Sequence, residues 1–259
     1  MNTFFKTIVW RNDPDFIADL LKALRGIRVV HLTGVDFTVD METFYTELTD
    51  KLGQIIPADE DAMTGSRSKE SARWTDIRYD ADQATYFRHS ATQQPLHTDT
   101  AYTSYENDLN FFFCRTRADI GGATTFFDGE ELYRILKKYE PELLDKIEHT
   151  IVTFDKGRTE RKAKPILQMK DGVVWLNWNY FRVSEQNTPA AKTLCDRFHQ
   201  FLEEKIVKGG LTTPVILAPG ECVFFQDNHI LHGRNAFFGD RALIKGALNF
   251  REAEVSGHQ

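Results

Sequence analysis

The sequence predicts a mainly β fold with flanking helices, the double-stranded β-helix or jelly roll. Short apolar runs such as Phe111-Phe112-Phe113 and Phe224-Phe225 have the length of buried strands. Turn residues, for example Gly121-Gly122 and Pro219-Gly220, separate these runs. A parallel α/β sheet would need a regular alternation of strands and helices, and this alternation is missing after residue 150. Helices packed outside a jelly roll account better for this pattern.

Two helices and one strand are predicted in the N-terminal part of the chain. Asp13-Pro14 has the pattern of a helix start, and a helical stripe of apolar residues follows as far as Gly26. Residues 27–32 form an apolar run typical of a strand, and residues 38–52 have the periodicity of a second helix. Residues 58–72 are polar and rich in serine, so we expect a loop there that acts as an active-site lid.

Strands dominate the remainder of the chain, with three further helices between them. Because no internal repeat, low-complexity tract or linker interrupts the sequence, residues 1–259 are expected to form a single domain. We expect helices over 128–138, 141–147 and 189–207, and strands over 109–115, 123–127, 150–154, 173–178, 214–217, 222–226 and 242–250.

The composition excludes several classes of function. The chain carries 38 acidic and 32 basic residues without a block of like charge, which gives no support for a nucleic-acid or membrane-surface role. No segment approaches the ~20 apolar residues that cross a bilayer, and the N-terminus lacks a signal peptide, so a cytoplasmic protein is expected. Three cysteines without paired spacing argue against disulfides and against cysteine-bound zinc. A small molecule is the expected partner, and a homo-oligomer is left open.

The most informative residues are His97 and Asp99, read together with His232. The side chains of a strand repeat every two residues, so an extended His-x-Asp segment points both side chains to one face. A second imidazole completes the two-histidine, one-carboxylate triad that holds non-haem Fe(II) and leaves coordination positions open. The pair alone is weak evidence, because most isolated histidines are structural or lie on the surface.

Three motifs in order carry a resemblance to a known family. Residues 94–102 (QPLHTDTAY), 121–128 (GGATTFFD) and 231–246 (LHGRNAFFGDRALIKG) resemble the taurine dioxygenase family of Fe(II)/2-oxoglutarate-dependent oxygenases. Clavaminate synthase and γ-butyrobetaine hydroxylase have similar signatures. Residues 25–32, followed by a predicted helix, are similar to the opening of the family, so the resemblance covers most of the chain.

The resemblance implies an Fe(II) site built from His97, Asp99 and His232. His229 lies in the same short segment and competes locally with His232 for this role. The family pattern places the ligand directly before Gly-Arg, and this selects His232.

The resemblance also implies anchors for 2-oxoglutarate. Arg241 would bind the distal carboxylate of the co-substrate, since its planar fork can hold a carboxylate in a bidentate manner. The hydroxyl of Thr124 would help to hold the same group. The alternative for Arg241 is a surface ion pair, for instance with Asp240, and Arg234 is expected to brace the loop.

The implied activity is that of a 2-oxoglutarate-dependent dioxygenase with O2 as the second co-substrate. The enzyme would hydroxylate a C–H bond of a small polar metabolite, such as an amino acid or another carboxylate, and release succinate and CO2. Asp99 favours hydroxylation over halogenation, because halogenating relatives have Gly or Ala at this position. Desaturation or cyclisation of a natural-product intermediate is an alternative outcome. A non-catalytic jelly-roll binding protein and a cupin-type zinc or manganese protein are the alternatives from other classes.

The identity of the substrate is not determined by the sequence. Lys245 lies four residues after Arg241 in a predicted strand, so both side chains are expected on the face that carries the iron. The resemblance implies that Lys245 meets an anionic group of the substrate; the alternative is that it extends to solvent. Further pocket candidates come from segments near the metal ligands or the expected lid: Gln93, Gln94, Tyr102, Arg88 and Trp74.

Overall fold

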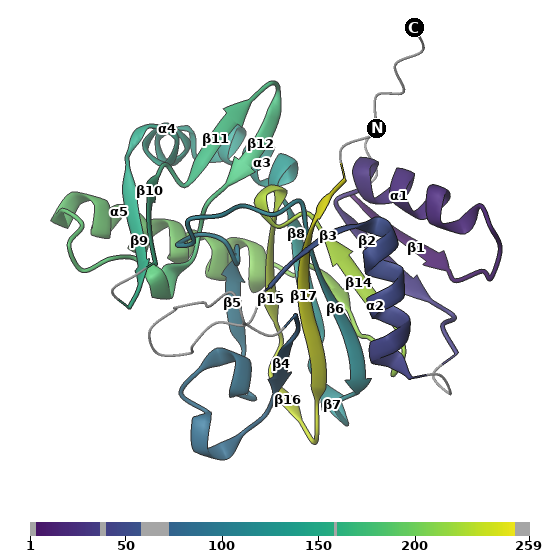
Figure 1. Ribbon diagram of the computed structural model, residues 1–259. Helices are drawn as coiled ribbons and strands as arrows, with labels where there is room; N and C mark the ends of the chain where they lie inside the picture. Colours follow the sequence, from purple (N-terminus) through teal and green to yellow (C-terminus); the bar gives the residue numbers. More distant parts are fainter. Residues whose placement is uncertain (1–3, 37–39, 58–72, 158–159, 252–259) are drawn as a thin grey trace, which may run out of the picture.

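A computed structural model describes residues 4–36, 40–57, 73–157 and 160–251 (Figure 1). The lid expected over residues 58–72 therefore lies outside the described residues. Within the described part, none of the helices combines the length and the apolar character that a membrane span requires.

Two mainly antiparallel sheets form the centre of the fold. The larger has seven strands in the order β1-β2-β14-β6-β17-β3, and β4 also pairs with β17. Only the β1–β2 pair in this sheet is parallel. The bounds of these strands are β1 Phe5–Val9, β2 Val29–Thr33, β3 Gly53–Ile56, β4 Thr75–Arg78, β6 Leu109–Thr116, β14 Cys222–Phe225 and β17 Ala242–Phe250.

The smaller sheet has the strand order β13-β8-β15-β5 and supplies both histidines of the predicted triad. Its strands are β5 Gln94–His97, β8 Thr124–Asp128, β13 Thr213–Val215 and β15 Ile230–Arg234. Three two-stranded sheets extend the fold: β9 Val152–Lys156 with β10 Glu160–Lys164, β11 Leu167–Lys170 with β12 Val173–Leu176, and β7 Ile120–Gly121 with β16 Phe237–Phe238.

The central strand β6 explains why its phenylalanine run is buried on both faces. Phe112 packs with Phe225 and Phe126 in the core between the two sheets. Phe111 and Phe113 point the other way, into a second core beneath the N-terminal helices. Because side chains alternate along a strand, one apolar run fills two hydrophobic layers.

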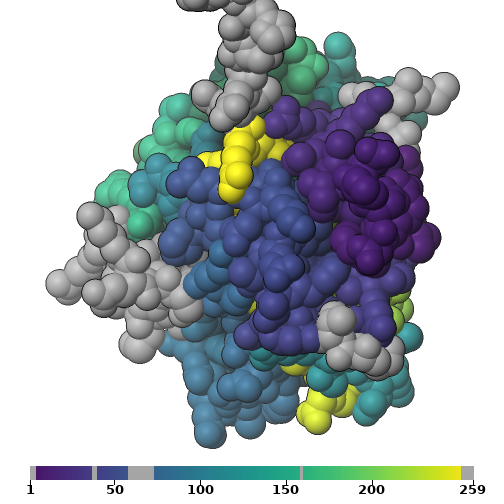
Figure 2. Space-filling model, turned by 45° about the vertical axis from the view of Figure 1, so that its right-hand side comes forward, coloured from purple at the N-terminus to yellow at the C-terminus, as the bar shows by residue number. Residues whose placement is uncertain are grey.

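Helices cover the outer faces of both sheets, which completes a layered jelly roll (Figure 1). Helices α1 Phe16–Gly26 and α2 Met41–Leu52 lie over the larger sheet, and Figure 2 looks onto this N-terminal layer in purple and blue. Helices α3 Gly129–Tyr139, α4 Pro141–His149 and α5 Pro189–Phe201 pack with the β9–β12 hairpins on the smaller sheet. Short turns of helix are η1 Ala81–Gln83, η2 Phe87–His89, η3 Tyr180–Arg182, η5 Asp227–His229 and the π-helix η4 Leu202–Val207.

The predicted fold class is confirmed, while several helix boundaries differ from the prediction. Helix α1 begins at Phe16 rather than after Asp13, because the Asp13 carboxylate accepts a hydrogen bond from the backbone of Asp15 and pairs with Arg11. The helix predicted over residues 189–207 is α-helical only as far as Phe201 and continues as a π-helix.

Several strands were not predicted, because their sequences lack an apolar pattern. Strand β10, Glu160–Lys164, alternates only between half-buried and exposed positions, and its residues are mostly charged. Its extended form follows from pairing with β9, to which it is joined residue by residue. Strands β1, β3, β4 and β11 were also missed, and each is only four or five residues long.

The three cysteines, Cys114, Cys195 and Cys222, are free, and the structure adds that all three are buried. Burial raises the pKa of the Cys114 thiol to about 11 and that of Cys195 to about 12. Both therefore behave as small apolar side chains rather than as nucleophiles or metal ligands.

Candidate metal centre

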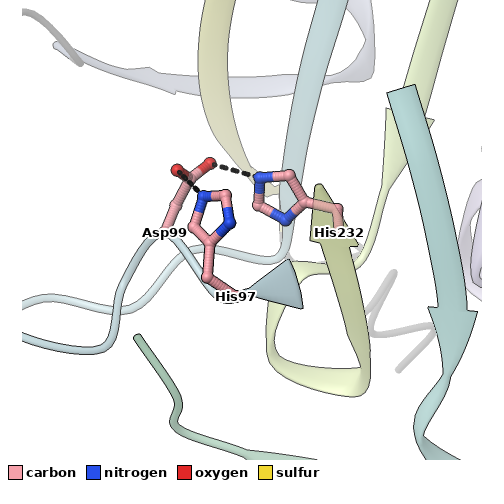
Figure 3. Close-up of side chains that lie close together, drawn as sticks. All are labelled: His97, Asp99 and His232. Atoms are coloured by element: carbon pink, nitrogen blue, oxygen red, sulfur yellow. Dashed lines mark ion pairs between the residues drawn. The ribbon is translucent and has the colours of Figure 1, made fainter. Parts of the chain in front are cut away.

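The three residues of the predicted triad lie together at one end of the smaller sheet (Figure 3). His97 ends β5, and His232 of β15 is directly opposite it in the antiparallel register. Each of the two imidazoles and the Asp99 carboxylate offers one ligand atom, and these atoms lie within 4.8 Å of one another. Asp99 is 3.7 Å from His97 Nε2 and 3.6 Å from His232 Nε2.

Asp99 reaches the cluster by a different route from the one predicted. It lies in the turn after β5 rather than in an extended segment, so the alternation of a strand does not aim its side chain. The buried carboxylate of Asp227 holds this turn by accepting hydrogen bonds from the backbone N–H groups of Asp99 (3.0 Å) and Thr100 (3.1 Å). Asn110 donates to Asp99 Oδ2 over 2.8 Å and fixes the carboxylate itself.

The two imidazoles are oriented with Nε2 toward the cluster. His97 Nδ1 lies 2.9 Å from the carbonyl oxygen of Pro95, which places the proton on Nδ1 and leaves Nε2 as a ligand atom. His232 Nδ1 is buried and makes no hydrogen bond within the described chain. The Asp227 carboxylate oxygen Oδ1 lies 3.4 Å from it. Burial and the neighbouring His97 lower the pKa of His232 well below its usual value, which favours the neutral, metal-binding form.

Asp99 is ionised in this setting. Burial alone would raise its pKa, but the neighbouring positive charge of Lys245 holds the pKa well below the usual range. Lys245 Nζ is 2.8 Å from Asp99 Oδ2. The site therefore offers two neutral nitrogen donors and one anionic oxygen donor.

This donor set fits Fe(II) better than a structural metal. Two imidazoles and one carboxylate on one side of a metal leave positions open, as in non-haem Fe(II) oxygenases. A structural zinc site takes four protein ligands. Over the described ranges of the chain, no fourth histidine, cysteine or carboxylate joins the cluster, so the cupin-type structural site loses its support.

His229 does not take part in the cluster. Its Nδ1 lies 2.8 Å from the carbonyl oxygen of Val174, and its ring packs edge-on against Trp175. Of the two histidines in this segment, His232 is therefore the one that faces His97 and Asp99.

Arg241 provides a buried positive charge beside the triad. Only 7% of its surface is exposed, and its Nε donates to the carbonyl oxygen of Gly122 over 3.1 Å. Burial lowers the pKa of the guanidinium to about 10, which leaves it charged at neutral pH. In the part of the chain that the structure describes, it has no ion pair with Asp240 or any other carboxylate. The surface ion-pair alternative is therefore wrong, and an arginine without an anion faces the same cavity as Thr124.

The comparisons with known proteins agree with this geometry. Residues 7–248 match the model of the family described as Taurine catabolism dioxygenase TauD, TfdA family. The chain belongs to this family. The expectation drawn from the three sequence motifs is thus confirmed for nearly the whole chain.

The individual relatives of this TauD/TfdA chain are distant. The trimethyllysine dioxygenase of Meyerozyma guilliermondii is 23% identical over 164 residues, which cover 59% of this chain and 41% of that protein. The structure of an asparagine oxygenase in complex with Fe(II), 2S,3S-3-hydroxyasparagine and succinate superposes with a TM-score of 0.70 at 14% identity, covering 92% of this chain and 80% of that chain. A taurine dioxygenase from Burkholderia xenovorans superposes with a TM-score of 0.63 at 16% identity, covering 93% and 84%. At these identities the superpositions establish the fold.

The metal cluster opens onto a cavity of about 400 Å³ that this TauD/TfdA chain builds between its two sheets and η3. Arg241 and Thr124 line it, and so do four side chains predicted to contact the substrate: Arg88, Gln94, Tyr102 and Lys245. Gln94 Nε2 lies 3.2 Å from His97 Nε2, and Arg88 donates to His89. Lys245 points to the metal side, as the strand periodicity predicted, rather than to solvent.

Two other candidate pocket residues do not line this cavity. Gln93 is exposed and donates to Glu203. Trp74 packs edge-on against Phe111 and Phe113 in the core under the N-terminal helices. The prediction was wrong for both, because nearness in sequence did not fix the side of the sheet on which they lie.

Arg234 braces the rim of the cavity, as predicted. It donates to the carbonyl oxygens of Phe87 (3.1 Å), Ser90 (2.6 Å) and Thr92 (2.8 Å) and so closes the loop before β5. Burial, followed by the charge of Arg241, lowers its pKa to about 9.

Asp227 is a functional candidate that sequence reasoning missed. It lies five residues before His232, and no local pattern shows that its carboxylate reaches back to the turn of Asp99. Its side chain is fully buried, and burial together with the charge of Asp99 raises its pKa to about 6. Carboxylates behind metal-bound histidines orient the ring and set its tautomer.

We predict that Asp227→Asn weakens Fe(II) binding by about 10–100-fold. The amide keeps the size of the side chain, but its NH2 group cannot accept the hydrogen bonds from Thr100, and the negative charge beside His232 is lost. Anaerobic Fe(II) titration measures the effect. Asp108→Asn is the matched control, because the Asp108 carboxylate also accepts from a backbone N–H, that of Phe250, but on the surface. Equal Fe(II) affinity in the Asp227 variant and the wild type would remove Asp227 from the site.

Proposed function

We propose that this chain is an Fe(II)- and 2-oxoglutarate-dependent dioxygenase that hydroxylates a C–H bond of a small acidic metabolite and releases succinate and CO2. One observation carries the proposal: the His97, Asp99 and His232 cluster and the uncompensated guanidinium of Arg241 face one buried cavity. A metal site alone would not need a buried arginine without a carboxylate partner, since burying such a charge is costly.

The roles of the side chains follow from their positions. His97, Asp99 and His232 would hold the iron, and Arg241 with Thr124 would bind the distal carboxylate of 2-oxoglutarate. When bound, the metal and its co-substrates supply the oxidation of an unactivated C–H bond, which no side chain can perform. The protein would bind and orient the reactants and exclude water. Phe112 lines the cavity as an apolar side chain, and Phe225 packs against the His232 ring behind it.

An anionic substrate is favoured by Lys245. Its ammonium group lies 2.8 Å from Asp99 of the triad, where it would meet a carboxylate or sulfonate of a substrate held beside the metal site. The names of the similar proteins suggest trimethyllysine, asparagine and taurine as candidate substrates. The fixed positive charge of trimethyllysine would lie among the cations of the cavity, so it is the least favoured of the three.

Desaturation or cyclisation remains an alternative outcome of the same reaction, because the positions of the side chains fix the metal and the co-substrate rather than the fate of the oxidised carbon. A non-catalytic binding protein is the alternative from another class. It would bind a metal or an anion in the same cavity without consuming O2, and a turnover measurement separates the two.

We expect the purified protein to bind one equivalent of Fe(II) under anaerobic conditions. Addition of 2-oxoglutarate should then produce a visible metal-to-ligand absorption band, and admission of air should release succinate. Protein loaded with Zn(II) is the control, since zinc occupies the ligands but has no redox chemistry. The assay is run in the presence of a panel of small acids as candidate substrates. If the protein binds Fe(II) and 2-oxoglutarate but releases no more succinate than the zinc control, the result would favour the non-catalytic binding protein.

A further inference from the structure

Strand β10 carries charged side chains that no part of the proposed function uses. Its positions alternate between half-buried and exposed, and the half-buried ones are Glu160, Lys162 and Lys164. Because side chains two residues apart lie on the same face of a strand, these three form one charged face. A half-buried charged face needs partners, since the removal of a charge from water is costly.

The partners of this charged face lie just after Asp99 in the chain. Each of the three side chains contacts the segment of residues 100–106. The contacts are Glu160 with the backbone N–H of Ser104 (3.0 Å), Lys162 with the carbonyl oxygen of Thr100 (2.9 Å) and with Glu106 (3.7 Å), and Lys164 with Glu106. The charged face of β10 is thus bound to the segment that leaves the metal site.

Thr100, the neighbour of Asp99 in the turn, is fixed at both of its backbone polar groups. Its N–H donates to the Asp227 carboxylate over 3.1 Å, and its carbonyl oxygen accepts from Lys162 Nζ over 2.9 Å. The same oxygen also accepts from the N–H and the hydroxyl of Thr103, each over 3.3 Å. The bond from Lys162 is the shorter one, and a charged donor makes it stronger than a neutral hydrogen bond.

Lys162 lies behind the metal site rather than in the cavity. Its side chain is 10% exposed, and of the two bonded residues it is Thr100 that lines the cavity. Burial and the neighbouring Lys164 lower the pKa of Lys162, while the negative charges of Glu106 and Asp227 act against this. A lysine with no partner to reach would extend its ammonium group into water. This ammonium group is instead held at a backbone carbonyl next to Asp99.

We propose that Lys162 is a positioning residue of the metal site: it holds the Thr100 carbonyl and thereby keeps the Asp99 carboxylate directed at the two histidines. The proposal rests on the proposed function, because the metal is the one that this triad would bind. Lys162 contacts Thr100 rather than a metal ligand, so its effect passes through the backbone to the adjacent residue. Groups that support the ligands in this way contribute to metal affinity.

Lys162→Met tests this role, because methionine keeps an unbranched apolar stem but removes the ammonium group. We expect anaerobic titration to give a Kd for Fe(II) about tenfold higher than that of the wild type. The second readout is the rise in Tm that a fixed concentration of Fe(II) produces. This rise should be smaller in the variant, since a ligand stabilises the folded state by an amount that its affinity sets. A merely structural role would lower the Tm of the metal-free protein and leave the Kd unchanged.

Lys164→Met is the matched control. It removes an equal charge from the same face of β10 and breaks an ion pair with the same Glu106, but it leaves the bond between Lys162 and Thr100 in place. It should keep the wild-type Kd for Fe(II). Lys162→Arg keeps the positive charge and N–H donors, so we expect it to recover most of the affinity that Lys162→Met loses.

The outcomes separate this inference from the proposed function. If the wild type binds Fe(II) and folded Lys162→Met binds it equally well, or if Lys164→Met loses as much affinity, the positioning role is wrong and the oxygenase assignment stands. Lys162→Gln, which is shorter and uncharged, takes the place of the methionine variant if that variant does not fold, and the same loss is expected. If neither folds, Lys162 supports the fold rather than the metal site, and the proposal is overturned. If the wild type binds no Fe(II), the proposed function itself has failed, and this inference with it.

Discussion

Alanine at His97 or at Asp99 is expected to reduce iron-dependent succinate formation to the level of the metal-free protein. Each substitution removes one of the three donors that lie within 4.8 Å of one another, and the two that remain cannot hold the metal with the same geometry. The Asp99 variant also leaves Lys245 and Asn110 without their shared acceptor, so its cavity becomes more positive. Bound iron per chain and succinate release measure the two effects separately.

His229→Ala is the matched control for these variants. It removes an imidazole from the same short segment as His232, but that ring contacts Val174 and Trp175 outside the cluster. It should retain both iron binding and turnover. Circular dichroism verifies that the His97 and Asp99 variants are folded. If both variants release succinate at the wild-type rate, the assignment of the metal site is contradicted.

The metal site was largely predictable because the two histidines are fixed by strand pairing. His97 and His232 lie on adjacent strands in direct register, and motifs in three segments pointed to their roles. Asp99 was predicted for an incomplete reason. A turn, and not an extended strand, carries it, and the turn is set by the distant carboxylate of Asp227. A sequence pattern does not reveal a contact between two residues that are 128 positions apart in the chain, as Asp99 and Asp227 are.

The substrate side of the cavity was less predictable, for the same physical reason. Lys245 was found because alternation along β17 places it on the metal face. Arg182 and Lys156 come from η3 and β9, and each approaches the ring of Tyr102. No pattern in either segment predicts a place in the cavity, so the positions of both side chains there required the structure.

The fold shows the same division between local and distant causes. Long apolar segments such as Leu109–Thr116 and Ala242–Phe250 were assigned correctly, because burial on both faces demands an apolar run. Short strands such as β4, Thr75–Arg78, owe their form to pairing with β17, and their own residues give little signal.

Substitution of Arg241 by leucine is expected to raise the KM for 2-oxoglutarate by about 100-fold, which corresponds to about 3 kcal/mol for the loss of charge-assisted hydrogen bonds to a carboxylate. Fe(II) affinity should stay close to that of the wild type, since Arg241 is not among the three metal donors. Arg241→Lys should give an intermediate KM, because lysine keeps the charge but loses the bidentate fork. Initial rates of succinate release over a range of 2-oxoglutarate concentrations give these values.

Asp240→Asn distinguishes this role from a merely structural one. If Arg241 served an ion pair with its neighbour, removing the Asp240 charge would disturb it as well. The structure instead places Asp240 on the surface, and the guanidinium of Arg241 is buried against Gly122. We therefore expect Asp240→Asn to keep the wild-type KM for 2-oxoglutarate. An Arg241→Leu enzyme with the same KM as the wild type would mean that another cation holds the distal carboxylate, and Arg234, the other buried arginine of the cavity, would be the first residue to examine.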